Sequence, residues 1–186
     1  MKRALDIVLV CLLAVFASSL LVISAALVKL TSRGPVLYWS NRVGRNNAIF
    51  AMPKLRTMRL GTPTVATHLL QAPEVYLTPL GSFLRRTSLD ELPQLWSILK
   101  GDMSFVGPRP ALFNQRDLID LRTACGVHTL IPGLTGWAQI NGRDELPIPQ
   151  KVALDSEYLQ CRTLAFDIKI LFLTLVKVIR RDNVTH

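Results

Sequence analysis

Near its start the chain has a predominantly apolar run, Ile7–Val28, that contains no charged side chain. A helix of roughly 22 residues is long enough to cross the ~30 Å hydrocarbon core of a bilayer. The run exceeds the ~7–15 apolar residues of a secretory signal peptide, and no small-x-small cleavage site follows it. The pattern therefore predicts a retained membrane helix in an N-terminal segment, residues 1–33, followed by one further domain, residues 34–186.

Basic residues flank this helix on both sides. They are Lys2 and Arg3 before it, and Lys29, Arg33, Arg42 and Arg45 after it. Cationic flanks favour the cytoplasmic side of a membrane, and a straight spanning helix can place only one end there. A helix that bends back satisfies both ends, and Ser18 and Ser19 near its middle can bend it by hydrogen bonding to backbone carbonyls. A plain single span is the alternative topology.

After residue 33 the hydrophobic pattern becomes short and is interrupted by glycine and proline. It predicts strands at 36–39, 103–106 and 136–140, a surface loop over 60–80, and helices at 78–86, 93–100, 111–123 and 148–180. An interfacial aromatic anchor is the alternative for residues 36–39. The apolar part of the last helix carries Asp167, Lys169 and Lys177, which favours an amphipathic helix on the membrane surface or against the core. The predicted fold class is α+β and predominantly helical, with a re-entrant membrane helix, a compact domain with short strands, and interfacial amphipathic helices.

The composition adds a strongly basic balance. The 22 Lys and Arg residues outnumber the 13 Asp and Glu residues, which gives a net charge of +9. Such a surface attracts nucleic acid, anionic lipid or a phosphorylated substrate. The sequence has no basic helix interleaved with aromatic residues, so lipid and phosphate are the expected partners and nucleic acid is not. The cysteines, Cys11, Cys125 and Cys161, form no CxxC pair, which is typical of reduced thiols in a cytoplasmic protein.

Asp90 and Glu91 are the strongest candidates for chemistry. Ser88-x-x-Glu91 matches a helix capping box, which is a purely structural alternative. Pro93, however, favours the first turn of a helix, so we expect the helix to begin near Pro93 and to leave both carboxylates at its positive end, where its dipole and Arg85 and Arg86 keep them ionised. An ionised carboxylate can attack phosphorus, and a second carboxylate beside it can hold Mg²⁺.

Several basic residues are candidates for binding phosphate. Arg109, between Pro108 and Pro110, lies on a rigid turn that can present its guanidinium to phosphate, or it is a solvated turn residue. Lys54 and Arg56, two apart, share a face if they lie on a strand, and they bind a second phosphate or are surface charges. The full candidate set is Lys54, Arg56, Arg85, Arg86, Arg109 and Arg143.

Five motifs follow one another along the chain. They are KLRTM at 54–58, SLDELPQL at 88–95, GDMS at 101–104, VGPRP at 106–110 and PGLTGWAQ at 132–139. In these motifs the chain resembles the bacterial sugar transferase family, the small monotopic phosphoglycosyl transferases, and the match covers nearly the whole chain. The resemblance implies transfer of a sugar phosphate from a UDP-sugar to polyprenol phosphate, which yields a polyprenyl diphosphate sugar and UMP.

The resemblance also implies roles for residues and a cellular location. Asp90 would be the nucleophile that takes up the phosphosugar, and Glu91 would bind Mg²⁺. The N-terminal helix would re-enter the bacterial inner membrane, and the catalytic domain would lie on its cytoplasmic face. The family helix bends at a Ser-Pro pair, whose place Ser18 and Ser19 take here, and Ser40 and Leu55 stand where Gln and Phe are frequent. Residues 61–78 and 144–150 are expected to help select the sugar.

Two other functions are open on the sequence. A membrane-anchored interaction protein would bind anionic lipid through its basic face and would not need Asp90 or Glu91. A membrane-bound phosphatase or diphosphatase would share an aspartyl-phosphate step but would release its product to water without any polyprenol phosphate.

Overall fold

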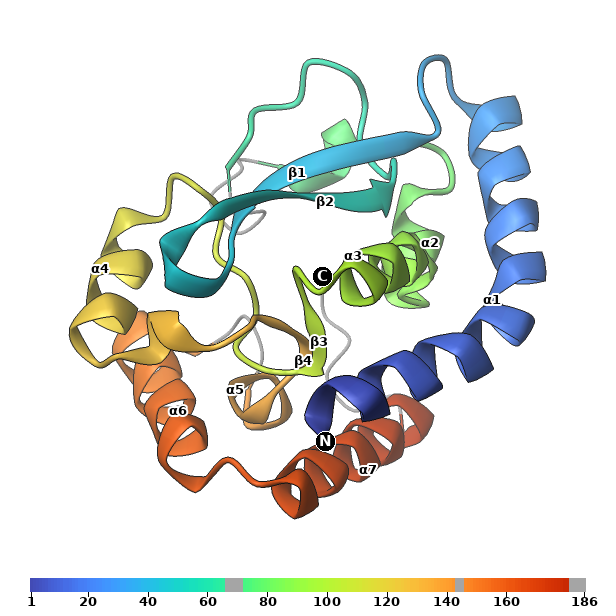
Figure 1. Cartoon of the computed structure of the whole chain (residues 1–186). Helices are drawn as coiled ribbons and strands as arrows, with labels where there is room; N and C mark the ends of the chain where they lie inside the picture. Colours follow the sequence, from blue (N-terminus) through green and yellow to red (C-terminus); the bar gives the residue numbers. More distant parts are fainter. Residues whose placement is uncertain (66–71, 143–145, 181–186) are drawn as a thin grey trace.

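The computed structural model describes residues 1–65, 72–142 and 146–180. Its helices are α1 (Lys2–Thr31), α2 (Gly81–Arg86), α3 (Leu95–Lys100), α4 (Arg116–Ala124), α5 (Trp137–Ile140), α6 (Ile148–Cys161) and α7 (Leu164–Arg180). Its strands are β1 (Leu37–Val43), β2 (Ile49–Leu55), β3 (Ser104–Val106) and β4 (Gly133–Thr135). The short 3-10 helices are η1 (Arg45–Asn47), η3 (Pro73–Tyr76), η4 (Leu89–Gln94) and η5 (Val127–Thr129). Figure 1 shows an α+β arrangement in which helix predominates.

The strands form two separate pairs. β1 and β2 form an antiparallel hairpin in which Arg42 pairs with Phe50. β3 and β4 are parallel, with Ser104 opposite Gly133, and the chain passes through α4 and η5 between them. A single bridge between Arg42 and Leu112 joins the hairpin to the segment that follows β3. This bridge brings the two pairs of strands together around the segment at 107–112.

Three glycines let the ends of β3 and β4 approach closely. A Cβ atom at Gly133 would lie 2.1 Å from the backbone nitrogen of Gly107, and one at Gly136 would lie 2.1 Å from the Gly107 carbonyl oxygen. No side chain fits at such distances. Instead, the Gly107 N–H donates to the Thr135 carbonyl oxygen and the Gly133 N–H to the Pro108 carbonyl oxygen, both at 2.9 Å. The two glycine-rich motifs therefore lie directly against each other.

The hydrophobic core lies between β3 and the helices around it. Ile98, Met103, Val106 and Ile170 are at most 2% exposed. Because Ile170 belongs to α7, one face of this helix packs against the core. Its other face is also apolar but exposed, with the residues Ile168, Phe172, Leu175 and Val178. The sequence predicts this helix either against the core or at a surface. In the structure, one face packs against the core and the other is an exposed apolar surface.

Polar contacts fasten the first turns of α1 to the rest of the molecule. Lys2 Nζ lies 2.6 Å from Asp167 Oδ2 on α7. Asp6 is buried, and its Oδ1 accepts hydrogen bonds from Ser104 Oγ and from the Phe105 N–H, both at 3.0 Å. These contacts join the start of α1 to β3 and to α7.

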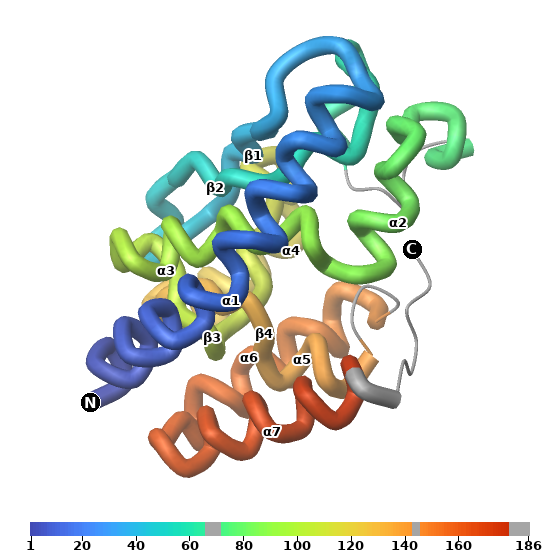
Figure 2. Tube along the Cα trace, turned by 90° about the vertical axis from the view of Figure 1, so that its right-hand side faces the viewer, coloured from blue at the N-terminus to red at the C-terminus, as the bar shows by residue number. Residues whose placement is uncertain are grey.

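The other end of α1 is held by Arg56. Its Nε donates to the Pro35 carbonyl oxygen and its Nη1 to the Arg33 carbonyl oxygen, both at 2.7 Å, and its Nη2 contacts Ser32. Both ends of α1 therefore contact the same domain. Figures 1 and 2 show the helix running along one side of the molecule.

Between these two ends, α1 is apolar and exposed. Val15 and Phe16 are 73% and 76% exposed. Ser18 Oγ donates to the Val15 carbonyl oxygen at 3.1 Å and Ser19 Oγ to the Phe16 carbonyl oxygen at 3.2 Å, as in helices that serines bend. In Figure 1 the helix changes direction near its middle. Among the described helices, α1 alone is long and apolar enough to cross a membrane.

The strand predicted at 136–140 is wrong. β4 ends before it, and Trp137–Ile140 form the single helical turn α5, closed by a hydrogen bond of 3.1 Å from the Ile140 N–H to the Gly136 carbonyl oxygen. The alternation of small and apolar residues there fits either element, and the close approach of Gly136 to β3 decides for a turn. The strands predicted at 36–39 and 103–106 are confirmed as parts of β1 and β3.

Four predicted helices have other bounds. The helix predicted at 78–86 begins only at Gly81. The helix predicted from residue 93 begins at Leu95, because Pro93 lies inside η4. The helix predicted at 111–123 begins only at Arg116. The predicted tail helix is two helices, because Arg162 is extended with φ −60° and ψ 116°. The loop expected at 60–80 contains η3, and its residues 66–71 lie outside the part of the chain that the structure describes.

Candidate active site

The carboxylate pair lies on η4, between α2 and α3 and against β2. Ser88, directly before η4, has a left-handed backbone with φ 56°, which is rare for a residue with a side chain. The Glu91 N–H donates to the Ser88 carbonyl oxygen at 3.1 Å, whereas the Ser88 side chain makes no capping hydrogen bond. The capping-box alternative is therefore wrong. The sequence predicts that the pair precedes the helical segment. In the structure, the pair instead lies inside the tight turn that leads into α3.

Two cations hold Glu91. Lys54 Nζ, from β2, lies 2.9 Å from Glu91 Oε1, and Arg109 Nη2 lies 3.0 Å from the same oxygen. Asp90, the neighbour of Glu91, is 6% exposed. The structure thus brings together four of the predicted site residues from three distant parts of the chain.

The pKa values of the two neighbouring carboxyls are shifted in opposite directions. Burial raises the pKa of Asp90 to about 6, and the nearby cations oppose this without outweighing it. Burial acts on Glu91 as well, but the charges and hydrogen bonds of Lys54 and Arg109 outweigh it and hold the pKa of Glu91 below its usual range. Glu91 is therefore a fixed anion at neutral pH. The sequence predicts that Asp90 is held firmly ionised. Its pKa instead lies within about one unit of neutral pH.

Of the two neighbouring arginines on α2, one joins the site. Arg85 Nε donates to Thr57 Oγ1 at 3.1 Å, and its charge acts on Asp90. Burial lowers the pKa of Arg85, and the charge of Asp90 partly offsets this. Arg86 is exposed. The helix turns the two side chains in different directions, so only Arg85 can contribute charge to the buried carboxylate.

Other predicted residues lie away from the dyad or outside the described residues. Lys54 and Arg56 would share a face only on a continuous strand, but β2 ends at Leu55. The Arg56 guanidinium instead donates hydrogen bonds to carbonyl oxygens just after the end of α1. Arg56 is thus a structural residue here. Arg143 lies outside the described residues, as do 66–71 and 144–145 of the two segments expected to select the sugar.

Two further residues at the site are not singled out by the sequence. Arg42 Nη1 donates to the Pro110 carbonyl oxygen at 3.2 Å. Gln94 is buried and lines a small cavity with Arg42 and Arg109, and its Nε2 has no hydrogen-bond partner within the described part of the chain. Residues three apart share a side of a 3-10 helix, so the spacing of Glu91 and Gln94 is a usable signal. Arg42 has no such signal, because its partner is distant in sequence.

The residues of the dyad fit a Mg²⁺ ion that arrives with a phosphate substrate. Within the described ranges, no group of three His, Cys, Asp or Glu side chains could hold a metal on its own. Mg²⁺ does not need such a cage, since one or two carboxylates with substrate phosphates and water are enough. Glu91 supplies an anionic oxygen, because its pKa is held below the usual range.

Comparison with known proteins connects this geometry to a family. The family described as bacterial sugar transferase matches residues 1–181. The UDP-glucose:undecaprenyl-phosphate glucose-1-phosphate transferase of Escherichia coli (strain K12) is 43% identical over an alignment that covers 95% of this chain and 40% of that protein. An undecaprenyl-phosphate glucose phosphotransferase of Komagataeibacter xylinus is 40% identical over 98% of this chain and 36% of its own length. The chain thus spans less than half the length of these two relatives.

A shorter relative matches over most of its length. The uncharacterized sugar transferase EpsL of Bacillus subtilis (strain 168) is 37% identical over 99% of this chain and 90% of its own length. The family match includes α1, the dyad and the glycine-rich contact between β3 and β4. The chain therefore belongs to the bacterial sugar transferase family.

Proposed function

We propose that the protein transfers a sugar 1-phosphate from a UDP-sugar to polyprenol (undecaprenyl) phosphate, as a first membrane step of bacterial glycoconjugate assembly. The observation that carries this is a buried carboxylate, Asp90, next to an anion, Glu91, that Lys54 and Arg109 hold. Such a cluster can bind a diphosphate and present a nucleophile to it. The names of two relatives, a UDP-glucose:undecaprenyl-phosphate glucose-1-phosphate transferase and an undecaprenyl-phosphate glucose phosphotransferase, support the choice of donor and acceptor.

In the first step, Asp90 is the nucleophile. One of its carboxylate oxygens attacks the phosphorus that carries the sugar. The bond between this phosphorus and the bridging oxygen breaks, and UMP leaves with that oxygen. The product is a phosphosugar joined to the Asp90 carboxylate as an acyl phosphate. Because its pKa is about 6, Asp90 is a better nucleophile than a solvated aspartate and is still largely ionised at pH 7.

In the second step, an oxygen of polyprenol phosphate attacks the same phosphorus. The bond to Asp90 breaks, the carboxylate is restored, and the new diphosphate carries both the lipid and the sugar. The two half-reactions balance to one UDP-sugar and one polyprenol phosphate consumed, and one UMP and one polyprenyl diphosphate sugar formed. Because the steps are separate, the aqueous donor and the lipid acceptor need not be bound together.

The cations of the site serve the phosphate oxygens. Lys54, Arg85 and Arg109 place positive charge around the dyad, where a low dielectric strengthens each interaction. Glu91 would hold Mg²⁺, which when bound neutralises charge on the diphosphate.

We also propose that α1 enters the membrane and leaves it on the same, cytoplasmic, side. The contacts of Lys2 and Asp6 at one end and of Arg56 at the other hold both ends on one domain. A helix that spans the membrane would separate its ends by the thickness of the bilayer. The exposed apolar face of α7 would then lie at the membrane surface, with the catalytic domain facing the cytoplasm of a bacterial inner membrane.

The test is UMP release by the full chain in detergent or lipid nanodiscs. The protein is incubated with Mg²⁺ and each of a panel of UDP-sugars, with and without polyprenol phosphate. We expect sustained UMP release that needs both substrates and is lost in Asp90→Asn. The matched control is Asp120→Asn, an exposed position on α4, which should retain the wild-type rate.

Intact-mass measurement of the protein with the UDP-sugar alone adds a direct readout. We expect a phosphosugar adduct on the wild type and none on Asp90→Asn. Release of free sugar phosphate without polyprenol phosphate would instead support a diphosphatase. Neither UMP nor an adduct with any donor would contradict the proposal and favour a lipid-binding protein.

A further inference from the structure

The turn that carries Arg109, between Pro108 and Pro110, is held by its backbone carbonyl oxygens. The Pro108 oxygen accepts the Gly133 N–H at 2.9 Å, and the Arg109 oxygen accepts Nη1 of Arg122 at 2.8 Å. The Pro110 carbonyl oxygen accepts a hydrogen bond from Nη1 of Arg42 on β1. The two prolines also have fixed φ angles and no N–H. The peptide planes on both sides of the Arg109 Cα are therefore set from outside the turn.

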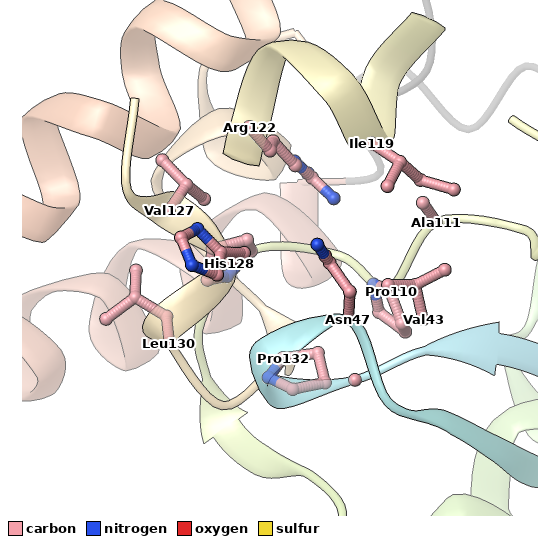
Figure 3. A pocket seen from close by; sticks show the side chains of 12 residues that line it. Val43, Asn47, Pro110, Ala111, Ile119, Arg122, Val127, His128, Leu130 and Pro132 are labelled. Carbon is pink, nitrogen blue, oxygen red and sulfur yellow. The ribbon is translucent and has the colours of Figure 1, made fainter. Parts of the chain in front are cut away.

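A buried ion pair holds Arg122 in place. Its Nε and Nη2 donate to Asp155 Oδ2 at 2.9 Å and 2.6 Å. The side chains of Arg122 and Asp155 are 9% and 2% exposed. Figure 3 shows Arg122 pointing from α4 into a pocket that Pro110 also lines. Because the guanidinium is planar, fixing its Nε–Nη2 edge on Asp155 also fixes the direction of Nη1.

Stability alone does not explain an ion pair at this position. Burying two charges costs several kcal/mol per ion, and apolar side chains of similar volume are often as stabilising or more so. Apolar side chains would fit at this position, because Ala111, Leu118 and Val152 form an apolar cluster at α4 and α6, the helices that carry the ion pair. Burial also raises the pKa of Asp155, although Arg122 opposes it, so the fold stabilises this carboxylate poorly.

We propose that Arg122 and Asp155 are positioning residues for Arg109. They hold the Arg109 carbonyl so that its guanidinium stays on Glu91 and within reach of a phosphate bound there. Neither residue has a hydrogen bond to the dyad among the contacts described, and both act through Arg109. The inference rests on the proposed function, since it assigns to Arg109 a role in that reaction.

The first test removes the positioning contact without leaving a buried charge. The double variant Arg122→Met with Asp155→Leu replaces the ion pair by apolar side chains, so we expect a melting temperature equal to or above that of the wild type. The rate of UMP formation should fall about 100-fold, because a displacement of ~1 Å at a catalytic group has an effect of that order. If the ion pair is purely structural, the double variant is equally stable but keeps wild-type activity, and this result would overturn the proposal.

A mutant cycle shows whether the effect passes through Arg109. In an Arg109→Ala background the double variant should lower the remaining rate by less than about twofold, because residues that act as a unit are not additive. A full additional loss of about 100-fold would overturn the proposal. Leu118→Ala is the matched control: it destabilises the same pair of helices and, at a temperature where it is folded, should change the UMP rate by less than about threefold.

A nuclear magnetic resonance readout separates this inference from the proposed function. The Arg109 Nε–H signal, assigned by its loss in Arg109→Ala, should shift and broaden in the double variant. An unchanged signal would overturn the positioning role whatever the activity. If the wild type forms no UMP, the proposed function fails and this signal still decides the inference.

Discussion

Asp90 and Glu91 are adjacent on η4, yet the pKa of Asp90 is raised to about 6 while that of Glu91 is held below its usual range. The difference has a simple cause. Burial acts on both, but Lys54 and Arg109 both contact the same oxygen of Glu91. Neighbouring acids whose pKa values are pushed apart are typical of sites in which two carboxyls have different roles. The asymmetry supports Asp90 as the group that reacts and Glu91 as the group that stays charged.

The pH dependence of the first half-reaction should report Asp90. Since only the ionised carboxylate attacks, the value of kcat/KM should rise about tenfold per pH unit below pH 6 and level off above it. The measurement is the initial rate of phosphosugar adduct formation between pH 4.5 and 8. Arg85→Met should move the midpoint to higher pH, because the charge of Arg85 lowers the pKa of Asp90. A plateau that extends below pH 5 would contradict this assignment.

Removing the charge of Asp90 should stabilise the protein while it abolishes activity. The pKa of Asp90 is higher in the folded protein than its ordinary value of 3.8, so its contribution to stability is present below about pH 4 and is lost as the pH rises through 6. At pH 7, Asp90→Asn should raise the free energy of unfolding by on the order of 1–3 kcal/mol. Thermal unfolding in detergent measures this.

Glu91→Gln provides the comparison of opposite sign. The pKa of Glu91 is lowered on folding, so its contribution is present above its ordinary value of 4.5 and is lost as the pH falls. Glu91→Gln should therefore destabilise the protein at pH 7, because it leaves Lys54 and Arg109 without their partner. If both variants moved the unfolding temperature in the same direction, the division between the two carboxyls would be wrong.

The contact between β3 and β4 should tolerate no side chain. Gly133→Ala puts a Cβ 2.1 Å from the Gly107 nitrogen, so β4 must move away and the turn with Arg109 loses its Gly133 hydrogen bond. We expect a loss of at least about 3 kcal/mol of stability or no folded protein. Gly44→Ala is the control, because its Cβ would lie 3.1 Å from the Phe50 ring and 3.2 Å from the Ala48 carbonyl oxygen, contacts that a small shift relieves. A folded, active Gly133→Ala protein would show that the strands are not so closely held.

The topology of α1 can be read by labelling. In a variant without native cysteines, one cysteine replaces either Ala4 or Arg33, and each protein is placed in vesicles of one orientation. A membrane-impermeant maleimide added on one side should label both, because both ends of α1 lie on the same domain. Labelling of the two positions from opposite sides would instead establish a spanning helix.

Features with local causes could be predicted from the sequence. The run Ile7–Val28 is long and uncharged, and it forms most of α1. Gly101 ends α3 as predicted, in a left-handed conformation with φ 98° that glycine adopts readily. The acidic pair could be identified as a candidate because it lies shortly before Pro93, which favours the first turn of a helix. Within the described residues, the dyad and its cations Lys54, Arg85 and Arg109 lie together.

Features that depend on distant partners could not be predicted. Arg56 is two residues from Lys54, but its guanidinium binds carbonyl groups at the end of α1, about twenty residues earlier in the chain. Arg122 has the spacing of an ordinary surface arginine, and only the fold places it between Asp155 and Arg109. The direction of the pKa shift of Asp90 also depends on tertiary burial, which no local pattern contains.

The hydrogen bonds of Asp6 have a consequence for preparing the protein. Asp6 lies on α1, and it occupies the backbone N–H of Phe105 on β3, two residues before the turn with Arg109 begins. A fragment that starts at residue 34 would leave that N–H and the Ser104 hydroxyl without their acceptor, and it would expose the strand that precedes the turn with Arg109. The start of the apolar helix therefore also supports, through β3, the turn that carries Arg109.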